Sequence, residues 1–497
     1  VQTLDRAWLA IDGRPLFAGL VSISEVYNTQ LEAHLVARLG VRFAAEPVAD
    51  PSKRPVREIV GVPAQLREAW SSRRAAIVAR QAELAVTFQH AHHRPPTPAE
   101  AIALAQQATL ETRQAKHEPR TLTEQRSAWA AQATAVLGAD GIARMLADVA
   151  AAAHGAGPAP TAAWIDEVAD EMVTRMGLSR ATWTVWHLQA EASRRARERA
   201  TSPGQATHLT AQLLAAATDR CIALEAWVDP ISDPQVLRRS DGESVYTTVG
   251  SRRFTSTAVI EAERQITDAA TLLNGRQASE ADVSLALLEA TANRINLTAG
   301  QAELVRRMAT SGRRVQLALA AAGSGKTTAL ATLGQAWRNS GGTVVGLAPS
   351  AVAARLLADH VGHATTLAKL AWDLHHHPRA AENLISPDTL LIVDEAGMAD
   401  TPSLAAVIGF AIHRGASVRL IGDDQQLAAV GAGGVLRDLA HAHPAVHLTE
   451  VLRFEDPAEA AASLALRDGR PESLGFYLDQ QRIHAGSDET VLRDALN

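Results

Sequence analysis

A glycine-rich segment between an apolar run and a helical pattern carries the residues best suited to bind phosphate. Residues 320–328 read AAAGSGKTT and follow the apolar residues 315–319. Glycines let backbone N–H groups turn toward phosphate oxygens, and the helix start adds the positive end of its dipole. In this P-loop pattern we expect Lys326 to reach the β- and γ-phosphates of ATP and Thr327 to place its hydroxyl on Mg²⁺. Ala320 stands where the pattern has its first glycine. The residues expected to contact the nucleotide here are Gly323, Ser324, Gly325, Lys326, Thr327 and Thr328.

A second apolar run ends in two adjacent carboxylates. Residues 390–393 read LLIV and are followed by Asp394 and Glu395. We predict that Asp394 holds the Mg²⁺ shell and that Glu395 polarises the attacking water, because the end of a strand frees Glu395 to point toward the γ-phosphate. A solvated strand end is the alternative, and the position downstream of a P-loop favours the catalytic interpretation.

Two further polar positions follow apolar runs. Residues 420–427 read LIGDDQQL, and an amide at that strand end can bond both the γ-phosphate and a neighbouring element. We therefore predict that Gln426 senses hydrolysis, with a simple turn before a helix as the alternative. Arg453, in the segment LTEVLRF at 448–454, could stabilise transition-state charge from a second lobe. Its residue type alone leaves a solvated arginine equally open.

Short apolar runs that alternate with helical stretches must position these residues. Such alternation is typical of a parallel, doubly wound sheet, so the predicted fold class is α/β: a P-loop NTPase of RecA-like type, with a parallel sheet flanked by helices. The predicted strands are 315–319, 343–348, 389–393, 417–421 and 446–448, and strand-like residues also occur at 245–248 and 253–257.

The part of the chain before this sheet is mostly helical. Apolar residues recur at helical spacing over 24–39 and 65–88, and Thr97 precedes a helix start as a candidate cap. Residues 120–230 have an almost wholly helical pattern. Helical periodicity carries no chemistry by itself, so we interpret residues 136–240 as a helical connector.

Composition sets limits on the class of protein. The 497 residues suggest two to four domains, and no apolar run reaches the roughly 18 residues that span a bilayer. Cys221 is the single cysteine, which excludes a disulfide framework and favours a cytoplasmic setting. The net charge of −6 does not indicate nucleic-acid binding by the chain as a whole, although single strands often bind in a local basic groove.

Several motifs together resemble a known family. Their order and spacing are similar to those of superfamily 1B (RecD-like) helicases, above all the helicase part of TrwC/TraI-type (MobF) conjugative relaxases. The resemblance implies that Gln301 contacts the adenine and that Pro349 and Ser350 lie along the DNA strand. It also implies that Gln426 couples two lobes and that Arg453 reaches the γ-phosphate. The motifs are LTAGQ at 297–301, the P-loop, APS at 348–350, VDEAGM at 393–398, GDDQQL at 422–427 and LRF at 452–454.

Segments within residues 1–130 resemble the C-terminal portion of the relaxase domain in the same family, among them PVREIVGV at 55–62. The chain is thus expected to combine an α+β relaxase remnant, the helical connector and a helicase segment. The expected boundaries are 1–135 for the end of the relaxase domain, 136–240 for the connector, 241–300 for an N-terminal helicase subdomain, 301–445 for the RecA-like lobe and 446–497 for the start of a truncated second lobe.

The family's nicking residues, a tyrosine and a metal-binding histidine triad, would precede residue 1. We therefore expect no DNA nicking, a structural role for Tyr27, and solvated surface at the histidine clusters 90–93 and 375–377. The favoured function is the ATP-binding segment of a DNA helicase that acts on single-stranded DNA in plasmid transfer, with the conjugation or secretion machinery as possible partners. The alternatives are a truncated or split fragment that binds ATP or DNA without turnover, and another P-loop enzyme such as an exonuclease subunit or a nucleotide kinase.

Overall fold

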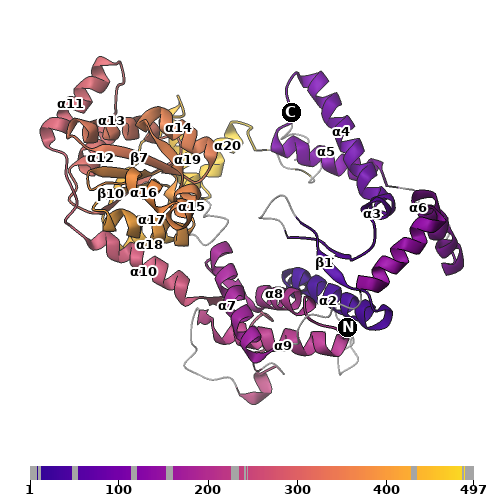
Figure 1. Cartoon of the computed structure of the whole chain (residues 1–497). Coiled ribbons are helices and arrows are strands. Elements are labelled where there is room, and N and C mark those ends of the chain that lie inside the picture. The colour runs from indigo at the N-terminus through magenta and orange to yellow at the C-terminus, as the bar shows by residue number, and fades with distance from the viewer. Residues whose placement is uncertain are drawn as a thin grey trace. The chain divides into compact units, whose positions relative to one another are not determined.

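A six-stranded, all-parallel sheet organises the C-terminal part of the computed structural model (Figure 1). The strand order is β11-β6-β10-β9-β7-β8. The predicted parallel sheet is confirmed, and each predicted strand within it is found to within one residue at either end. The strands are β6 (Val315–Ala320), β7 (Thr343–Ala348), β8 (Ala364–Thr366), β9 (Thr389–Val393), β10 (Ser417–Gly422) and β11 (Ala445–Leu448).

The structure describes residue 8 and residues 13–47, 54–113, 120–152, 160–224, 234–239, 242, 244–426, 434–483 and 486. The chain divides into two compact units. One unit takes in residues 1–23, 162–192 and 211–483, and the other takes in residues 24–161, 193–210 and 484–497. Within the described ranges, no helix has both the length and the apolar character needed to cross a membrane.

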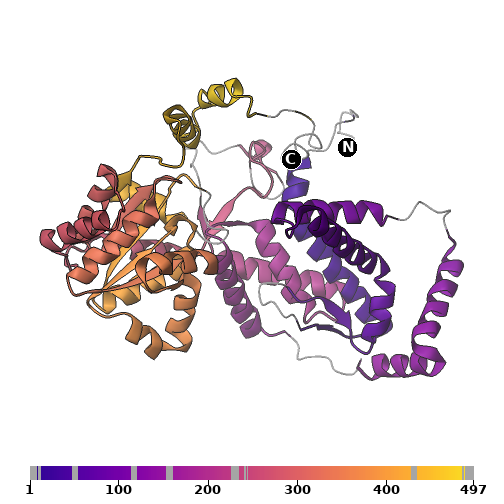
Figure 2. The ribbon, with the colours of Figure 1, turned by 90° about the horizontal axis from the view of Figure 1, so that it is seen from above.

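Helices cover both faces of the six-stranded sheet (Figure 2). Strands β6, β9 and β10 are buried along their whole length, which explains their continuous apolar sequence. One face is covered by α10 (Thr257–Thr271), α15 (Leu367–His376), α16 (Pro378–Leu384), α17 (Thr401–His413) and α18 (Val435–Ala442). The other face is covered by α11 (Glu280–Ala292), α12 (Ala299–Ala309), α13 (Lys326–Asn339) and α14 (Ala351–Val361).

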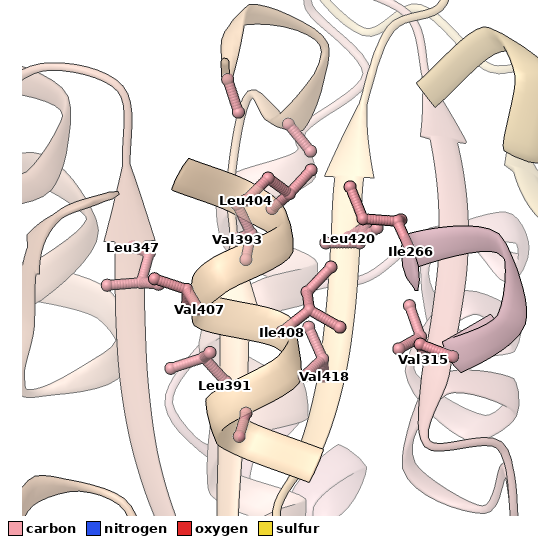
Figure 3. Packing of buried hydrophobic residues seen from close by; sticks show 14 of the residues in the cluster. Ile266, Val315, Leu347, Leu391, Val393, Leu404, Val407, Ile408, Val418 and Leu420 are labelled. Atoms are coloured by element: carbon pink, nitrogen blue, oxygen red, sulfur yellow. The ribbon is translucent and has the colours of Figure 1, made fainter. Parts of the chain in front are cut away.

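Alternation along the strands divides their side chains between these two faces. In β9, Leu391 and Val393 belong to the core beneath α17, whereas Leu390 and Ile392 belong to the core beneath α13. Figure 3 shows Val407 of α17 packed above the first of these cores. Burial on both faces makes this sheet the rigid frame from which the polar strand ends project.

A fully buried arginine fastens α12 to the sheet. Arg419 in β10 donates to the backbone oxygens of Met308 (2.7 Å) and of Ser311 (3.1 Å). It also donates to the backbone oxygen of Arg313 at 3.1 Å, and burial lowers its pKa to about 9. Because these carbonyls satisfy the guanidinium, the sheet tolerates a polar side chain that also fixes the end of α12.

Strand β11 corrects one predicted boundary. It pairs with β6 in parallel, from Ala445 beside Leu317 to Leu448 beside Ala320. The predicted division between residues 445 and 446 therefore falls inside this sheet. The last described helices, α19 (Pro457–Arg467) and α20 (Ser473–Asp479), follow it within the same unit.

The remainder of this unit is a smaller helical and antiparallel part. Its three-stranded sheet has the order β3-β5-β4. The strand-like prediction at 253–257 holds for 253–255, but residues 245–248 form a bridge and turns instead of a strand. The elements are α1 (Gly13–Ala18), α7 (Ala162–Ser179), β3 (Trp183–Thr184), α8 (Val185–Arg197), α9 (Pro203–Asp219), β4 (Ile222–Leu224), η1 (Gln235–Leu237) and β5 (Arg253–Thr255).

The second unit is helical, with one short hairpin of strands. The helix expected at 65–88 is two helices that meet at Ser71, where no glycine or proline marks the break. Thr97 caps α5 in a capping box with Glu100, as predicted. The elements are α2 (Leu20–Leu39), which begins in the first unit, β1 (Phe43–Ala45), β2 (Arg57–Ile59), α3 (Ala64–Trp70), α4 (Ser72–His92), α5 (Pro98–Glu111) and α6 (Leu122–Ala152).

Ion pairs join part of the expected connector to the N-terminal helices of this second unit. Glu25 accepts from Arg194 at 2.8 Å and from Arg197 at 3.0 Å. Glu32 pairs with Arg57 at 3.0 Å, and Arg197 lies 3.4 Å from it as well. Residues 193–210 thus share a compact unit with residues 24–161, so the predicted boundary at 135/136 does not separate structural units.

Candidate nucleotide-binding site

The P-loop joins β6 to α13 at the carboxyl edge of the sheet. Gly323 and Gly325 have φ values of 80° and 74°, a region that side chains other than glycine rarely adopt. A Cβ at Gly325 would lie 2.3 Å from Nε2 of Gln301, and one at Gly323 would lie 2.7 Å from Cβ of Arg453. Both glycines are therefore required by backbone geometry and by close neighbours, and Lys326 begins α13 directly after them.

The structure brings Lys326 and Glu395 together. Nζ of Lys326 lies 2.7 Å from Oε1 of Glu395, and the side chains are 10% and 29% exposed. Glu395 follows the end of β9 and adopts a left-handed conformation, with φ 51° and ψ 41°. Strained backbone of this kind concentrates at functional sites. The predicted phosphate-binding lysine and the predicted water-polarising carboxylate thus share one edge of the sheet.

Asp394 lies half-buried between the ends of β7 and β9. Its backbone N–H donates to the carbonyl of Leu347 at 2.9 Å, and its Oδ1 accepts from the N–H of Glu395 at 2.9 Å. Burial raises the pKa of Asp394, the negative charge of Glu395 adds to the rise, and Lys326 opposes it. A bound cation would reverse this cost of burying a carboxylate.

The residues predicted to hold Mg²⁺ fit that ion. Mg²⁺ is usually bound by one or two carboxylates together with substrate phosphates, which corresponds to Asp394 and the hydroxyl of Thr327 in the first turn of α13. Across the ranges that the structure covers, no group of three or more His, Cys, Asp or Glu side chains forms a dedicated metal cage. The donor set is therefore of the kind that a nucleotide completes.

An acidic pair follows β10 and is clamped by an arginine that sequence reasoning missed. Arg467 in α19 reaches Oδ1 of Asp423 at 2.6 Å and Oδ1 of Asp424 at 3.0 Å. Burial raises the pKa of Asp423, but the hydrogen bonds from Arg467 and from the N–H of Gln425 outweigh it, and the net pKa is lowered. The predicted sensor Gln426 approaches Oδ2 of Asp423 at 3.5 Å.

Arg453 reaches the P-loop from the same unit. The N–H of Leu452 donates to the carbonyl of Gly323 at 2.8 Å, which places the exposed Arg453 beside that glycine. The idea that Arg453 comes from a second lobe is therefore wrong for this chain, because the segment after β11 returns over its own P-loop.

Gln301 lies under the P-loop, where both ends of its amide are bonded to protein. Its Oε1 accepts from the N–H of Thr298, and its Nε2 donates to the carbonyls of Ser324 and Gly325. The residue is 2% exposed. The implied contact with adenine is not reflected in this arrangement.

The other predicted residues lie apart from the phosphate loop. Pro349 and Ser350 follow β7, and the Ser350 hydroxyl caps α14 by accepting from the N–H of Ala353. Thr328 lies in the first turn of α13. Tyr27 is 64% exposed on α2, so it does not fill the core that a structural role suggests.

Both histidine clusters lie on exposed helix ends. His92 stacks on Phe88 with ring centroids 4.0 Å apart, and His376 stacks on Trp372 at 4.1 Å. In each pair the histidine Nδ1 bonds the backbone oxygen of its stacking partner. The imidazoles are thus part of local helix-end packing on the surface.

Comparison with known proteins gives two family matches. A family model described as TrwC relaxase matches residues 1–136, and one described as AAA domain matches residues 296–488. An AAA domain implies nucleotide binding, generally with a divalent metal ion, which agrees with the P-loop and Asp394.

Curated relatives point the same way. The conjugal transfer protein TraA of Rhizobium radiobacter is 29% identical over 270 residues, 53% of this chain and 24% of that protein. TraA of Agrobacterium fabrum is 27% identical over 258 residues, 51% of this chain and 23% of that protein. The ATP-dependent RecD2 DNA helicase of Deinococcus radiodurans is 36% identical over 170 residues, 32% of this chain and 22% of that protein. The match spans about a quarter of the length of each relative.

Proposed function

We propose, on the premise that the two matched domains fit a TrwC-type relaxase–helicase, that this chain binds ATP·Mg²⁺ and uses it in helicase-type processing of single-stranded DNA during conjugative transfer. The observation that carries the proposal is the 2.7 Å contact between Lys326 and Glu395 at the carboxyl edge of the parallel sheet. This contact puts a phosphate-binding cation and a carboxylate within reach of the same phosphoryl group. The relatives' conjugal transfer and helicase names support the cellular role, which we place in the cytoplasm.

In the proposed reaction, Lys326 leaves Glu395 to bind the β- and γ-phosphates, while N–H groups of the P-loop bond the phosphate oxygens. Asp394 and Thr327 hold the Mg²⁺, which neutralises charge on the phosphates. Once released from Lys326, Glu395 orients the attacking water and accepts its proton. Arg453, beside Gly323, stabilises the charge that develops on the transferred group.

The second candidate is a nucleotide- or DNA-binding segment without productive turnover or nicking. The observation that favours it is the same ion pair, because Lys326 is neutralised by Glu395 and nucleotide must displace that contact before any reaction. Contacts to single-stranded DNA at Pro349 and Ser350, and to conjugation machinery, belong to the proposal under either candidate.

Steady-state ATPase activity with and without single-stranded DNA tests the proposal. We expect DNA-stimulated turnover in the wild type and its loss in Lys326→Ala. Lys369→Ala is the matched control, since Lys369 is a lysine on exposed α15 paired with Asp373, and its loss should leave turnover unchanged. Nucleotide binding without turnover in the wild type would favour the second candidate, and turnover retained by Lys326→Ala would refute the assigned site.

A further inference from the structure

The side chain of Gln301 holds two structural elements at once. At the start of α12, Oε1 of Gln301 accepts from the N–H of Thr298 at 2.9 Å, and the Thr298 hydroxyl accepts from the N–H of Gln301 at 3.3 Å. This reciprocal capping box fixes the position of the side chain relative to α12. The far end of α12 is in turn bonded to the sheet through Arg419.

The amide nitrogen of Gln301 is turned onto the P-loop. Nε2 donates to the carbonyl of Ser324 at 3.1 Å and to the carbonyl of Gly325 at 3.2 Å. A primary amide has two N–H donors, so both are used. The approach is close enough that only a glycine fits at position 325.

These two carbonyls control the groups that face the phosphate. The carbonyl of Ser324 shares a planar trans peptide with the N–H of Gly325, and the carbonyl of Gly325 shares one with the N–H of Lys326. Because C=O and N–H point in opposite directions across such a peptide, holding the carbonyls on the Gln301 side turns both N–H groups to the opposite side. That is the side on which a P-loop binds phosphate oxygens.

We propose that Gln301 is a positioning residue that sets the shape of the phosphate loop and does not read the nucleobase. The inference rests on the proposed nucleotide binding and specifies its substrate class: through Gln301 the site selects a triphosphate group, whichever base is attached. This departs from the adenine contact that the family resemblance implies for Gln301.

Binding of three Mg²⁺-loaded probes separates the two roles: ATP, GTP and inorganic tripolyphosphate, which has no base. In Gln301→Met, which keeps the length of the side chain and removes its hydrogen bonds, we expect affinity for all three probes to fall by a similar factor of about ten, as for the loss of one to two net hydrogen bonds. Gln301→Glu keeps the acceptor for Thr298 but loses both donors, so it should weaken all three probes as well. Isothermal titration calorimetry measures each affinity directly.

Thr298→Ala is the matched control because it removes the hydroxyl side of the capping box and leaves the bonds from Gln301 to the P-loop intact. We expect it to lower the melting temperature while changing affinity less than twofold. The ratio of ATP to GTP affinity should be the same in all four proteins.

The possible results distinguish the two proposals. A Gln301→Met protein that loses ATP affinity relative to GTP and keeps its affinity for tripolyphosphate would show that Gln301 reads the base, and it would overturn the inference. Unchanged affinity for every probe in both Gln301 variants would overturn it as well. Failure of the wild type to bind any probe would instead refute the proposed function, and the inference with it.

Discussion

Replacing Glu395 by glutamine should change binding and turnover in opposite directions. In the nucleotide-free protein Lys326 is held by Glu395, so phosphate and carboxylate compete for one ammonium group. The amide of the Glu395→Gln variant has the same shape without the negative charge, so the competition would weaken. The carboxylate is also the predicted acceptor for the proton of the attacking water, and an amide cannot take that role.

The size of each effect follows from the geometry. The pair is 2.7 Å long with side chains 10% and 29% exposed, so solvent screens it only in part. A pair of this kind stabilises the nucleotide-free state by about 1 kcal/mol, which corresponds to roughly fivefold tighter ATP binding once it is removed. Loss of a general base lowers turnover by on the order of 10²-fold or more.

Equilibrium binding of ATP·Mg²⁺ and steady-state turnover should be measured on Glu395→Gln, the wild type and Asp373→Asn. The last variant removes the carboxylate of a lysine ion pair on exposed α15, away from the P-loop, and should match the wild type. If Glu395→Gln binds ATP no more tightly than the wild type, the ion pair does not compete with phosphate. If it keeps its turnover, Glu395 is not the base.

Two substitutions test the neighbouring carboxylates. The pKa of Asp394 is raised mainly by burial, so its charged form costs folded stability as pH rises through that pKa; Asp394→Asn should therefore raise the melting temperature of the nucleotide-free protein at neutral pH and abolish stabilisation by Mg²⁺ with ATP, as thermal unfolding would show. An unchanged or lower melting temperature would contradict that assignment. The lowered pKa of Asp423 means that its ion pair with Arg467 stabilises the fold above the ordinary carboxyl range and is lost as pH falls. Arg467→Met should cost about 3 kcal/mol in urea unfolding at neutral pH because Asp423 remains buried and unpaired. The pH dependence should weaken in parallel, and a cost below about 1 kcal/mol would show that the clamp is not structural.

The sheet could be predicted from sequence because its central strands are buried on both faces and therefore read as unbroken apolar runs. The P-loop could be predicted because its backbone geometry demands glycines at fixed positions. Strand β8 was not predicted: Ala364–Thr366 contains no apolar run and pairs only with β7 at the edge. The division of the helical segment at Ser71 was missed for a similar reason, since ordinary helix-forming residues continue on both sides of it.

The partners of the site residues were harder to predict than the residues themselves. Arg467 belongs to no recognisable motif, and only the path of the chain after β11 brings it to Asp423. The boundary at residue 445 failed because a short strand such as β11 carries no mark of the lobe to which it belongs. Residue spacing predicts which side chains stand at strand ends, whereas long-range pairing decides what holds them.

Those partners imply an order of events at the site. Gln301 and Arg467 bond groups behind the phosphate-binding surface, so nucleotide can enter without disturbing either of them. Lys326 is different, because its partner Glu395 is itself a predicted catalytic group. Phosphate that captures Lys326 frees Glu395 in the same exchange. The carboxylate therefore becomes available to a water molecule only when there is a phosphoryl group for that water to attack, and this coupling requires no residue beyond the pair.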